Sequence, residues 1–219
     1  MYRLLIFFLL VNALGTKAQS TIKLFNGKSL KGWYAFEPET GKHLDARELF
    51  KVQDKMIRLN GSKAGYLMSE QSFRNFQLTL EYKWNTDSTI ARKPGKYNSG
   101  VMYLVPVETK DTLWPKGIQF QVKDGGTGDF VLLQELTLNI KGKMTAPGRS
   151  VVMPRFADAE KPLGEWNTIV ITCQDGKVTQ QLNGKLVNEG VEASVKEGRI
   201  LLQYEGYPID FRNLVLKKL

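Results

Sequence analysis

The protein has 219 residues, of which 42% are hydrophobic, and this length suits one domain with a sizeable core. Its formal net charge is +9, but the Lys and Arg residues are scattered along the chain. Nucleic-acid-binding surfaces usually cluster such residues among exposed aromatic ones, so no nucleic-acid partner is indicated. Cys173 is the only cysteine, which excludes an internal disulfide framework and a thiolate metal cluster. We expect Cys173 to be a buried strand residue.

The N-terminal segment MYRLLIFFLLVNALGTKAQS has the features of a signal peptide. An early arginine precedes an apolar run from Leu4 to Leu14, and small residues near Ala18 suit a cleavage site. This run is too short to span a membrane, and no other segment is apolar enough to do so. We therefore predict a signal peptide over residues 1–18, one domain over residues 19–219, and export to the periplasm or the extracellular space.

Alternation of apolar and polar residues dominates the rest of the chain. In FQLTLEYKW, the side chains of Phe76, Leu78 and Leu80 share one face, which we expect to lie in the core. Similar alternation recurs in SGVMYLVPV, GRILLQYEG and FRNLVLKKL. No window predicts a long amphipathic helix, and SEQSFRNF is expected to hold at most one short turn.

Turn signals separate these predicted strands at short intervals. Asp175-Gly176 and Asn183-Gly184 are dipeptides typical of two-residue hairpin turns, and a further hairpin is expected to turn near Asp54-Lys55. Many short strands joined by such turns predict an all-β sandwich or barrel. The longer irregular segments 36–49, 86–97 and 139–162 are expected to wall a functional cleft or to cover a sheet edge.

The segment IQFQVKDGGTGDF, residues 118–130, begins as a strand and ends in a glycine-rich bend. It lacks the lysine and the following helix of a phosphate-binding loop, and it lacks the ligand spacing of an EF-hand. A single Ca²⁺ bound partly by backbone oxygens stays open. The alternative is purely structural: the glycines permit a tight bend, and Asp124 and Asp129 bond the loop backbone.

The bend does not account for the two glutamines of this strand, Gln119 and Gln121. If the apolar residues face the core, both amides lie on the outer face of a sheet, where donors and acceptors suit sugar hydroxyls. Other strands carry polar residues in the same alternating way. We expect six of these side chains to converge on one concave surface: Glu81, Lys83, Gln121, Asp124, Gln203 and Glu205.

Five segments resemble a known family in content and order. They are LFNGKSLKGWY, YNSGVMY, WPKGIQFQVKDGGTGDF, GEWNTIVITCQDGKVTQQLNGKLV and GRILLQYEGYPIDFRNLVLKKL. Together they resemble the 3-keto-disaccharide hydrolase domain family over nearly all of residues 21–219. The resemblance implies a concanavalin A-like jelly-roll sandwich of two antiparallel sheets. It also implies cleavage of glycosides already oxidised to a ketone at sugar carbon 3, by hydrolysis or by elimination.

This chemistry needs a base, because the ketone acidifies the hydrogen on carbon 2 and its removal lets the substituent on carbon 1 leave. The family pattern has Glu-x-Gln where this chain has Gln119-Phe120-Gln121. An amide cannot serve as a general base or supply charge to a metal. Other groups must then carry the acid–base chemistry, and the candidates are Glu205, Asp124 and His43.

The candidates for binding the sugar are Glu81, Lys83, Arg92, Gln119, Gln121, Gln203 and Arg212. The expected ligand is a small sugar substrate or a glycan. The sequence does not indicate metal ligands, a cofactor or an oligomeric state. A bound divalent ion is left as an alternative. Two rivals to the enzyme are a non-catalytic sugar-binding module, which the Gln119 departure favours, and a structural sandwich of a larger envelope assembly.

Overall fold

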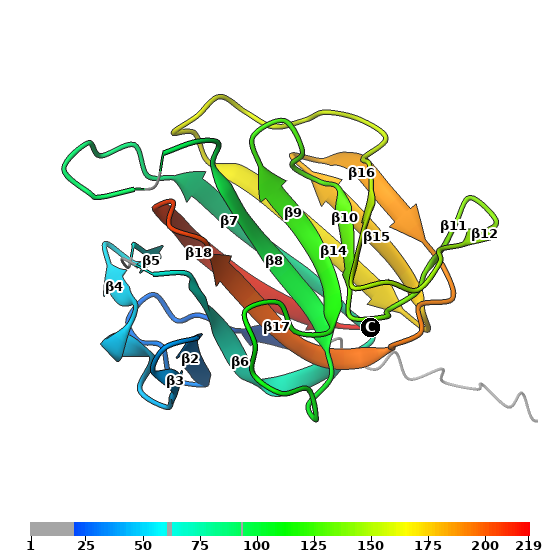
Figure 1. The fold of residues 1–219 in the computed structure, drawn as a ribbon, viewed down its shortest axis with the longest axis horizontal. Helices are drawn as coiled ribbons and strands as arrows, with labels where there is room; N and C mark the ends of the chain where they lie inside the picture. Colours follow the sequence, from blue (N-terminus) through cyan, green and yellow to red (C-terminus); the bar gives the residue numbers. More distant parts are fainter. Residues whose placement is uncertain (1–19, 61–62, 93) are drawn as a thin grey trace, which may run out of the picture.

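The computed structural model describes residues 20–60, 63–92 and 94–219, and within them two antiparallel sheets pack face to face (Figure 1). The predicted two-sheet sandwich is thereby confirmed. The predicted signal peptide, residues 1–18, lies outside the described residues. No helix in the described part of the chain has the length and apolarity that crossing a membrane requires.

The first sheet, named here the β7 sheet, contains eight of the described strands. In spatial order they are β16 (Lys185–Gly190), β15 (Lys177–Leu182), β14 (Asn167–Gln174), β7 (Phe76–Trp84), β18 (Ile209–Lys218), β5 (Met56–Leu59) and β4 (Lys51–Gln53), with β1 (Thr21–Lys23) also paired to β18.

The second sheet, the β9 sheet, also contains eight described strands and lies in front in Figure 1. Its order is β13 (Ser150–Met153), β10 (Phe130–Leu133), β9 (Gly117–Lys123), β8 (Asn98–Val105), β17 (Glu197–Tyr204), β6 (Gly65–Arg74), β2 (Trp33–Glu37) and β3 (Gly41–His43). A small hairpin of β11 (Asn139–Ile140) and β12 (Lys143–Met144) and the 3₁₀ turn η1 (Ala46–Glu48) complete the described elements.

The core lies between the inner faces of the two sheets, where the apolar half of each alternating strand meets its counterpart. Phe76, Leu78 and Leu80 are fully buried there, as predicted, and they face side chains of the β9 sheet such as Ile118 and Phe120. Cys173 is buried in the same core, and burial raises the pKa of its thiol. Burial of apolar area on this scale is the main force that holds two sheets together.

The predicted hairpin turns form as expected. Asp175-Gly176, Asn183-Gly184 and Asp54-Lys55 all have positive φ at both positions, which is the backbone of a type I′ turn. In SEQSFRNF, residues 69–74 continue strand β6, and the expected short turn is the tight link to β7 at Asn75, with φ 48°.

The outer face of the β9 sheet carries a second apolar cluster, which includes Tyr34, Tyr66, Met102 and Leu201. The segment 106–116, called the strap here, is bonded to this face. The strap residue Asp111 accepts hydrogen bonds from the hydroxyls of Tyr34 (2.7 Å) and Tyr66 (2.5 Å). The Arg199 guanidinium donates to the strap carbonyl of Pro106 at 3.1 Å. These bonds fix the strap on the sheet.

The Asp54-Lys55 turn generates a first prediction. Lys55 has φ 60°, a region that favours glycine, so Lys55→Gly should raise the free energy of unfolding by about 1 kcal/mol. Gly184 has φ 81° and open space around its missing Cβ, so Gly184→Lys should lower it by a similar amount. Urea unfolding of the two variants measures both effects. A change in the free energy of unfolding with the same sign in both variants would contradict this account.

The strap generates a pH prediction. Burial and then the hydrogen bond to Asp111 raise the pKa of Tyr34 and Tyr66 above the ordinary 10. A raised folded-state pKa contributes stability that is fully present below about pH 10 and is lost as the pH rises further. Tyr66→Phe should therefore unfold about 1 kcal/mol more easily at pH 8, because Asp111 loses a donor. Between pH 10 and 11 the variant should lose stability less steeply than the original protein, and an unchanged slope would count against a role for Tyr66.

Candidate functional site

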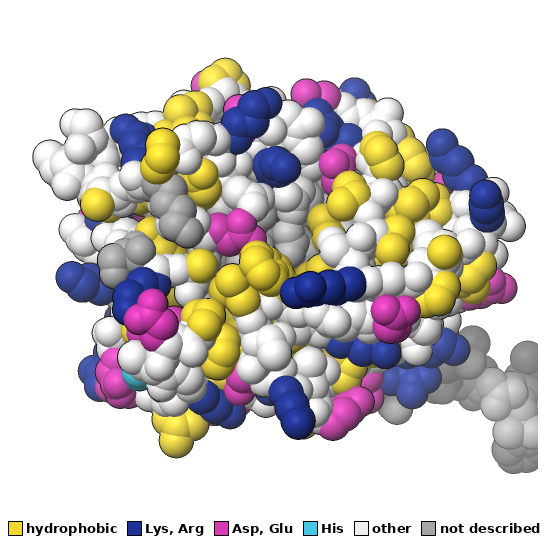
Figure 2. Space-filling model, viewed as in Figure 1, with side chains coloured by type: hydrophobic (Ala, Val, Ile, Leu, Met, Phe, Trp, Pro, Cys, Tyr) yellow, Lys and Arg dark blue, Asp and Glu magenta, His cyan; other side chains and the backbone are white. Residues whose placement is uncertain are grey.

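A cleft of about 600 Å³ opens on the outer face of the β9 sheet. Its apolar wall consists of Val131, Leu133 and Val152 from β10 and β13, and Trp114 of the strap and Arg149 also line it. Figure 2 shows this face of the molecule, with a hollow near the centre and hydrophobic side chains gathered to its right. A cleft of this size can hold a sugar or a small glycoside.

The floor of the cleft is polar because strand β9 alternates as predicted. Ile118, Phe120 and Val122 point into the core, and Gln119 and Gln121 point outward into the cleft. The two glutamines are only 5% and 9% exposed, so their amides need partners within the protein. Nε2 of Gln119 donates to Oε1 of Gln121, and Nε2 of Gln121 donates to Oδ1 of Asn98 at 3.0 Å.

Glu205, directly after β17, ends this series of hydrogen bonds. Nδ2 of Asn98 donates to one of its carboxylate oxygens, and the indole Nε1 of Trp114 donates to the other at 3.1 Å. Among the described residues that line the cleft, Glu205 is the only acidic one. Two donors to an anion are charge-assisted bonds, and they hold the carboxylate in a fixed orientation.

The series Gln119, Gln121 and Asn98, called the amide relay here, has a direction. Each amide donates its N–H group to the next residue toward Glu205. This direction follows from the chemistry, since an ionised carboxylate only accepts and every preceding amide must then present its donor forward. The carbonyl oxygen of Gln119 stands at the other end, where it can accept from a ligand hydroxyl.

Trp114 is the aromatic residue of the cleft, with 41% of its surface exposed. Nε2 of Gln134 donates to its backbone carbonyl at 3.1 Å, while its indole reaches Glu205. The indole edge is thus fixed beside the carboxylate and part of the ring surface remains open. Exposed aromatic faces of this kind suit the apolar faces of sugar rings.

Gln203, another predicted binding residue, lies on the same outer face as Glu205, two positions earlier in the chain. The register of β17 pairs it with Tyr66, and its alternate neighbours Leu202 and Tyr204 point into the core. Gln119, Gln121, Gln203 and Glu205 are therefore the predicted residues that the fold brings to one region.

Three other predicted residues lie on the opposite side of the molecule. Glu81, Lys83 and Arg212 are on the outer face of the β7 sheet, where Arg212 is bonded to Glu81. The Arg212 guanidinium lies 3.8 Å from the ring centre of Trp166, and the Lys83 ammonium lies 5.1 Å from it. The expected convergence of six residues on one surface was therefore wrong, because alternation marks an outward face without indicating which sheet carries it.

The remaining predicted residues line neither the cleft nor its floor. Asp124 is on the β9–β10 turn and lines a second cleft with Trp84 and Glu160. His43 ends β3, at the edge of the β9 sheet opposite β13, and its ring nitrogens contact Thr40 (2.6 Å) and Glu48 (2.7 Å). Arg92 donates to the hydroxyl of Tyr97.

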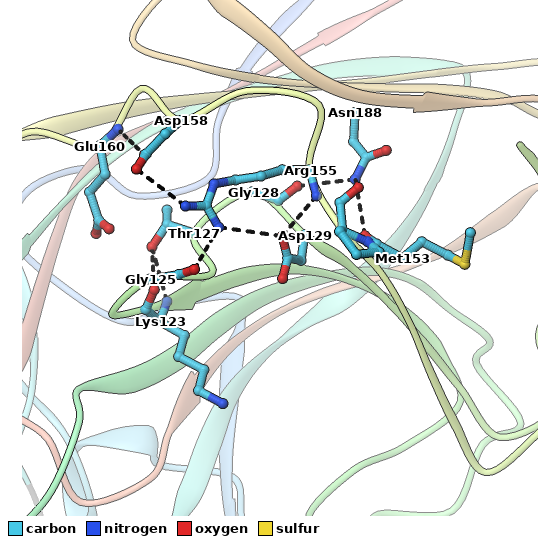
Figure 3. A network of polar contacts seen from close by, with 11 residues as sticks. Lys123, Gly125, Thr127, Gly128, Asp129, Met153, Arg155, Asp158, Glu160 and Asn188 are labelled. Carbon is cyan, nitrogen blue, oxygen red and sulfur yellow. Dashed lines mark hydrogen bonds and ion pairs between the residues drawn. The ribbon is translucent and has the colours of Figure 1, made fainter. Parts of the chain in front are cut away.

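The glycine-rich bend is held by structural contacts (Figure 3). The backbone N–H of Arg155 donates to Asp129 (2.8 Å), and its guanidinium donates to the carbonyl of Gly125 (2.7 Å) and pairs with Asp158 (3.2 Å). Asp129 therefore secures the bend through Arg155, which lies outside the loop, whereas the sequence predicted bonds to the loop's own backbone. Within the described ranges, no group of three or more His, Cys, Asp or Glu side chains is placed to hold a metal ion.

Trp114, Asn98 and Arg149 are cleft residues that the sequence analysis did not single out. Asn98 lies in the YNSGVMY segment, and its place at the start of a strand was the available signal. The strap that carries Trp114 has no periodic pattern that could have revealed its contact with Glu205.

Solved structures share the fold of this chain. A solved structure of a candidate glycosyl hydrolase from Parabacteroides distasonis has a TM-score of 0.64 and 21% identity, covering 91% of this chain and 94% of that one. The β-glucanase of Bacillus licheniformis has a TM-score of 0.53 and 13% identity, covering 93% and 99%. At these identities the likeness shows the fold, which is the predicted jelly-roll sandwich.

The chain belongs to the family of 3-keto-alpha-glucoside-1,2-lyase-like domains, whose model matches residues 20–217. It is also 26% identical over 189 residues to a 3-keto-disaccharide hydrolase of Bacteroides thetaiotaomicron. That match covers 78% of this chain and 59% of the relative, so the chain spans about three-fifths of the relative's length. The family resemblance drawn from the sequence is confirmed.

The amide relay generates a prediction for Gln119→Glu. With carboxylates at both ends, the two amides between them cannot donate in both directions, so two oxygens must meet somewhere in the series. The variant should lose about 1 kcal/mol of stability in the presence of a chelator. Added Mn²⁺ or Ca²⁺ should restore this loss by neutralising the second charge.

The measurement is thermal unfolding of both forms with chelator and with each ion. Gln134→Glu is the matched control, because Gln134 lies at the cleft but outside the relay. An ion-dependent shift of equal size in both variants would contradict the relay.

Proposed function

We propose that the protein is an exported enzyme that cleaves 3-keto-glycosides in the cleft on the β9 sheet, with Glu205 as the general base. The observation that carries the proposal is the setting of Glu205: an acidic side chain among amides, oriented by Asn98 and Trp114 beside an exposed aromatic surface. Membership of the 3-keto-alpha-glucoside-1,2-lyase-like family supplies the reaction class. The signal-peptide features of residues 1–18 support export.

The reaction begins when Glu205 takes the proton from carbon 2 of the sugar, and the electron pair of that C–H bond forms an enolate with the ketone at carbon 3. The enolate then re-forms the ketone, a double bond forms between carbons 1 and 2, and the bond from carbon 1 to the leaving oxygen breaks. The leaving oxygen takes a proton, which protonated Glu205 or water supplies. Addition of water to the double bond gives net hydrolysis.

The cleft provides groups for each need of this reaction. The amide relay offers donors and acceptors to the sugar hydroxyls, and Trp114 offers a surface to the ring. Arg149 lines the cleft, and its side chain has no hydrogen-bond or ion-pair partner among the described residues. It is free to contact the aglycone.

A second candidate function is sugar binding without cleavage. Two observations favour it: Gln119 replaces the glutamate that the family resemblance leads us to expect, and both oxygens of Glu205 already accept a hydrogen bond. Each oxygen keeps a second lone pair for a substrate, but these bonds hold the carboxylate in place as an acceptor, which is the role that a binding site needs.

The test is release of the aglycone from a chromogenic 3-keto-glucoside. Glu205→Gln should lower the turnover number by about 10²–10⁴, the usual cost of losing a general base. Asp124→Asn, in the second cleft, is the matched control and should stay close to the original protein. The same assay should show higher turnover for Gln119→Glu, which restores a second carboxylate.

Two results would contradict the proposal. Equal activity of Glu205→Gln and the original protein would exclude Glu205 as the base. Saturable binding of the 3-keto-glucoside with no release by any form would establish the binding module.

A further inference from the structure

The amide of Gln203 is buried without any hydrogen bond. The residue has no exposed surface, and neither Oε1 nor Nε2 has a hydrogen-bond partner in the described protein. Burying an unpaired amide is unfavourable, since it loses its bonds to water and gains none. Buried polar groups of proteins are almost always paired, so a fully unpaired amide beside a cleft indicates a ligand that pairs it.

Gln203 does not line the open cleft, but the strand register sets it next to the cleft floor. The register of β17 with β8 pairs Leu202 with Val101, and continuing this register sets Gln203 beside Gly100. Gln121 pairs with Gly100 from the other side, on strand β9. Gln203 and Gln121 thus flank a residue that has no side chain.

The missing side chain of Gly100 leaves room that Gln119 occupies. A Cβ built on Gly100 would lie 2.5 Å from Cδ of Gln119, so the end of this flexible side chain rests directly on the β8 backbone. Gln119 is a long side chain with several rotatable bonds, and among the described residues its amide end has one hydrogen bond, to Gln121. When Gln119 swings outward, the space above Gly100 opens next to Gln203.

We propose that this space is the inner subsite of the cleft and that Gln203 there binds the α-hydroxyketone of the oxidised sugar ring. The inference rests on the proposed function, and it assigns the ketone and its adjacent hydroxyl to Gln203. A primary amide presents a donor and an acceptor side by side. An α-hydroxyketone presents an acceptor, the ketone oxygen, beside a donor, the adjacent hydroxyl, so the two match as a pair of hydrogen bonds.

This placement also fits the proton transfer. Gln203 lies near the end of β17 and Glu205 follows the strand directly, so the two residues are about 7 Å apart along an extended chain. With the ketone oxygen held by Nε2 of Gln203, the neighbouring carbon 2 lies between the amide and the Glu205 carboxylate. As Glu205 removes the proton, negative charge develops on the oxygen that Gln203 donates to, and a fixed donor at that point stabilises the enolate.

The test compares Gln203→Met with the original protein in three measurements: thermal unfolding, kinetics with a 3-keto-glucoside, and binding of a 3-keto-glucoside against the parent glucoside. Methionine fills a similar volume without an unpaired amide, so the melting temperature should rise. The turnover number should fall about 10²–10³-fold, the usual cost of losing one donor to a developing oxyanion. The ratio of the affinity for the 3-keto-glucoside to the affinity for the parent glucoside should decrease.

Gln180→Met is the matched control. Gln180 is equally buried and also has an unpaired Oε1, but it lies between the sheets, where its Nε2 donates to the hydroxyl of Tyr103 at 2.8 Å. Its replacement should lower the melting temperature, because Tyr103 loses its partner, and should leave sugar binding and turnover unchanged. A higher melting temperature for Gln203→Met and a lower one for Gln180→Met would show that the Gln203 amide serves a ligand and that the Gln180 amide stabilises the fold.

Gly100→Ala tests the subsite without touching Gln203. The methyl group would displace the flexible end of Gln119 and fill the space above β8, so the fold should persist and binding of the keto sugar should weaken. The inference is overturned if the original protein cleaves the 3-keto-glucoside and Gln203→Met or Gly100→Ala retains full turnover and keto preference. If the original protein neither binds nor cleaves the 3-keto-glucoside, the proposed function itself fails.

Discussion

The pair of hydrogen bonds that Asn98 and Trp114 donate to Glu205 connects three parts of the chain that are distant in sequence. Asn98 begins β8, Trp114 belongs to the strap, and Glu205 follows β17. Carboxylates hold the strap at two points: its own Asp111 binds tyrosines of the sheet, and the sheet's Glu205 binds its tryptophan. The cleft wall, the orientation of the carboxylate and the direction of the amide relay all depend on this arrangement.

This polar network lies on an outer sheet face that is otherwise largely apolar and covered. The neighbouring cluster of Tyr34, Met102 and Leu201 packs beneath the strap, while the cleft begins where Gln121 and Asn98 replace apolar residues. Partly buried amides gain little net stability from pairing with one another. Their arrangement is better explained by a ligand that needs both donors and acceptors, and the unpaired Gln203 extends that argument to the proposed inner subsite.

The sequence predicts the features that depend on a single strand, such as which side chains face outward. It does not predict the features that depend on how distant strands pair, such as which sheet a strand joins. Alternation correctly sets Gln119 and Gln121 opposite Ile118 and Phe120, because the period of two is a property of the extended chain. The same rule marks Glu81 and Lys83 as outward-facing, and they are, but on the other sheet. Strand order depends on packing between distant segments, and Trp114 reaches Glu205 from a strap without any period, so neither feature could be read from the pattern.

The glycine-rich bend and the glutamines, though adjacent in sequence, serve different ends. Asp129 and Gly125 are bonded to Arg155 and secure the loop, whereas the glutamines form the cleft floor. The central claim is that this floor presents Glu205 to carbon 2 of a 3-keto sugar. The most direct measurement is solvent exchange at that carbon, followed by NMR in D₂O on a 3-keto sugar that lacks a leaving group at carbon 1. The account predicts that the protein catalyses loss of the carbon-2 proton signal and that Glu205→Gln does not, whereas no exchange, or exchange at carbon 4 alone, would contradict it.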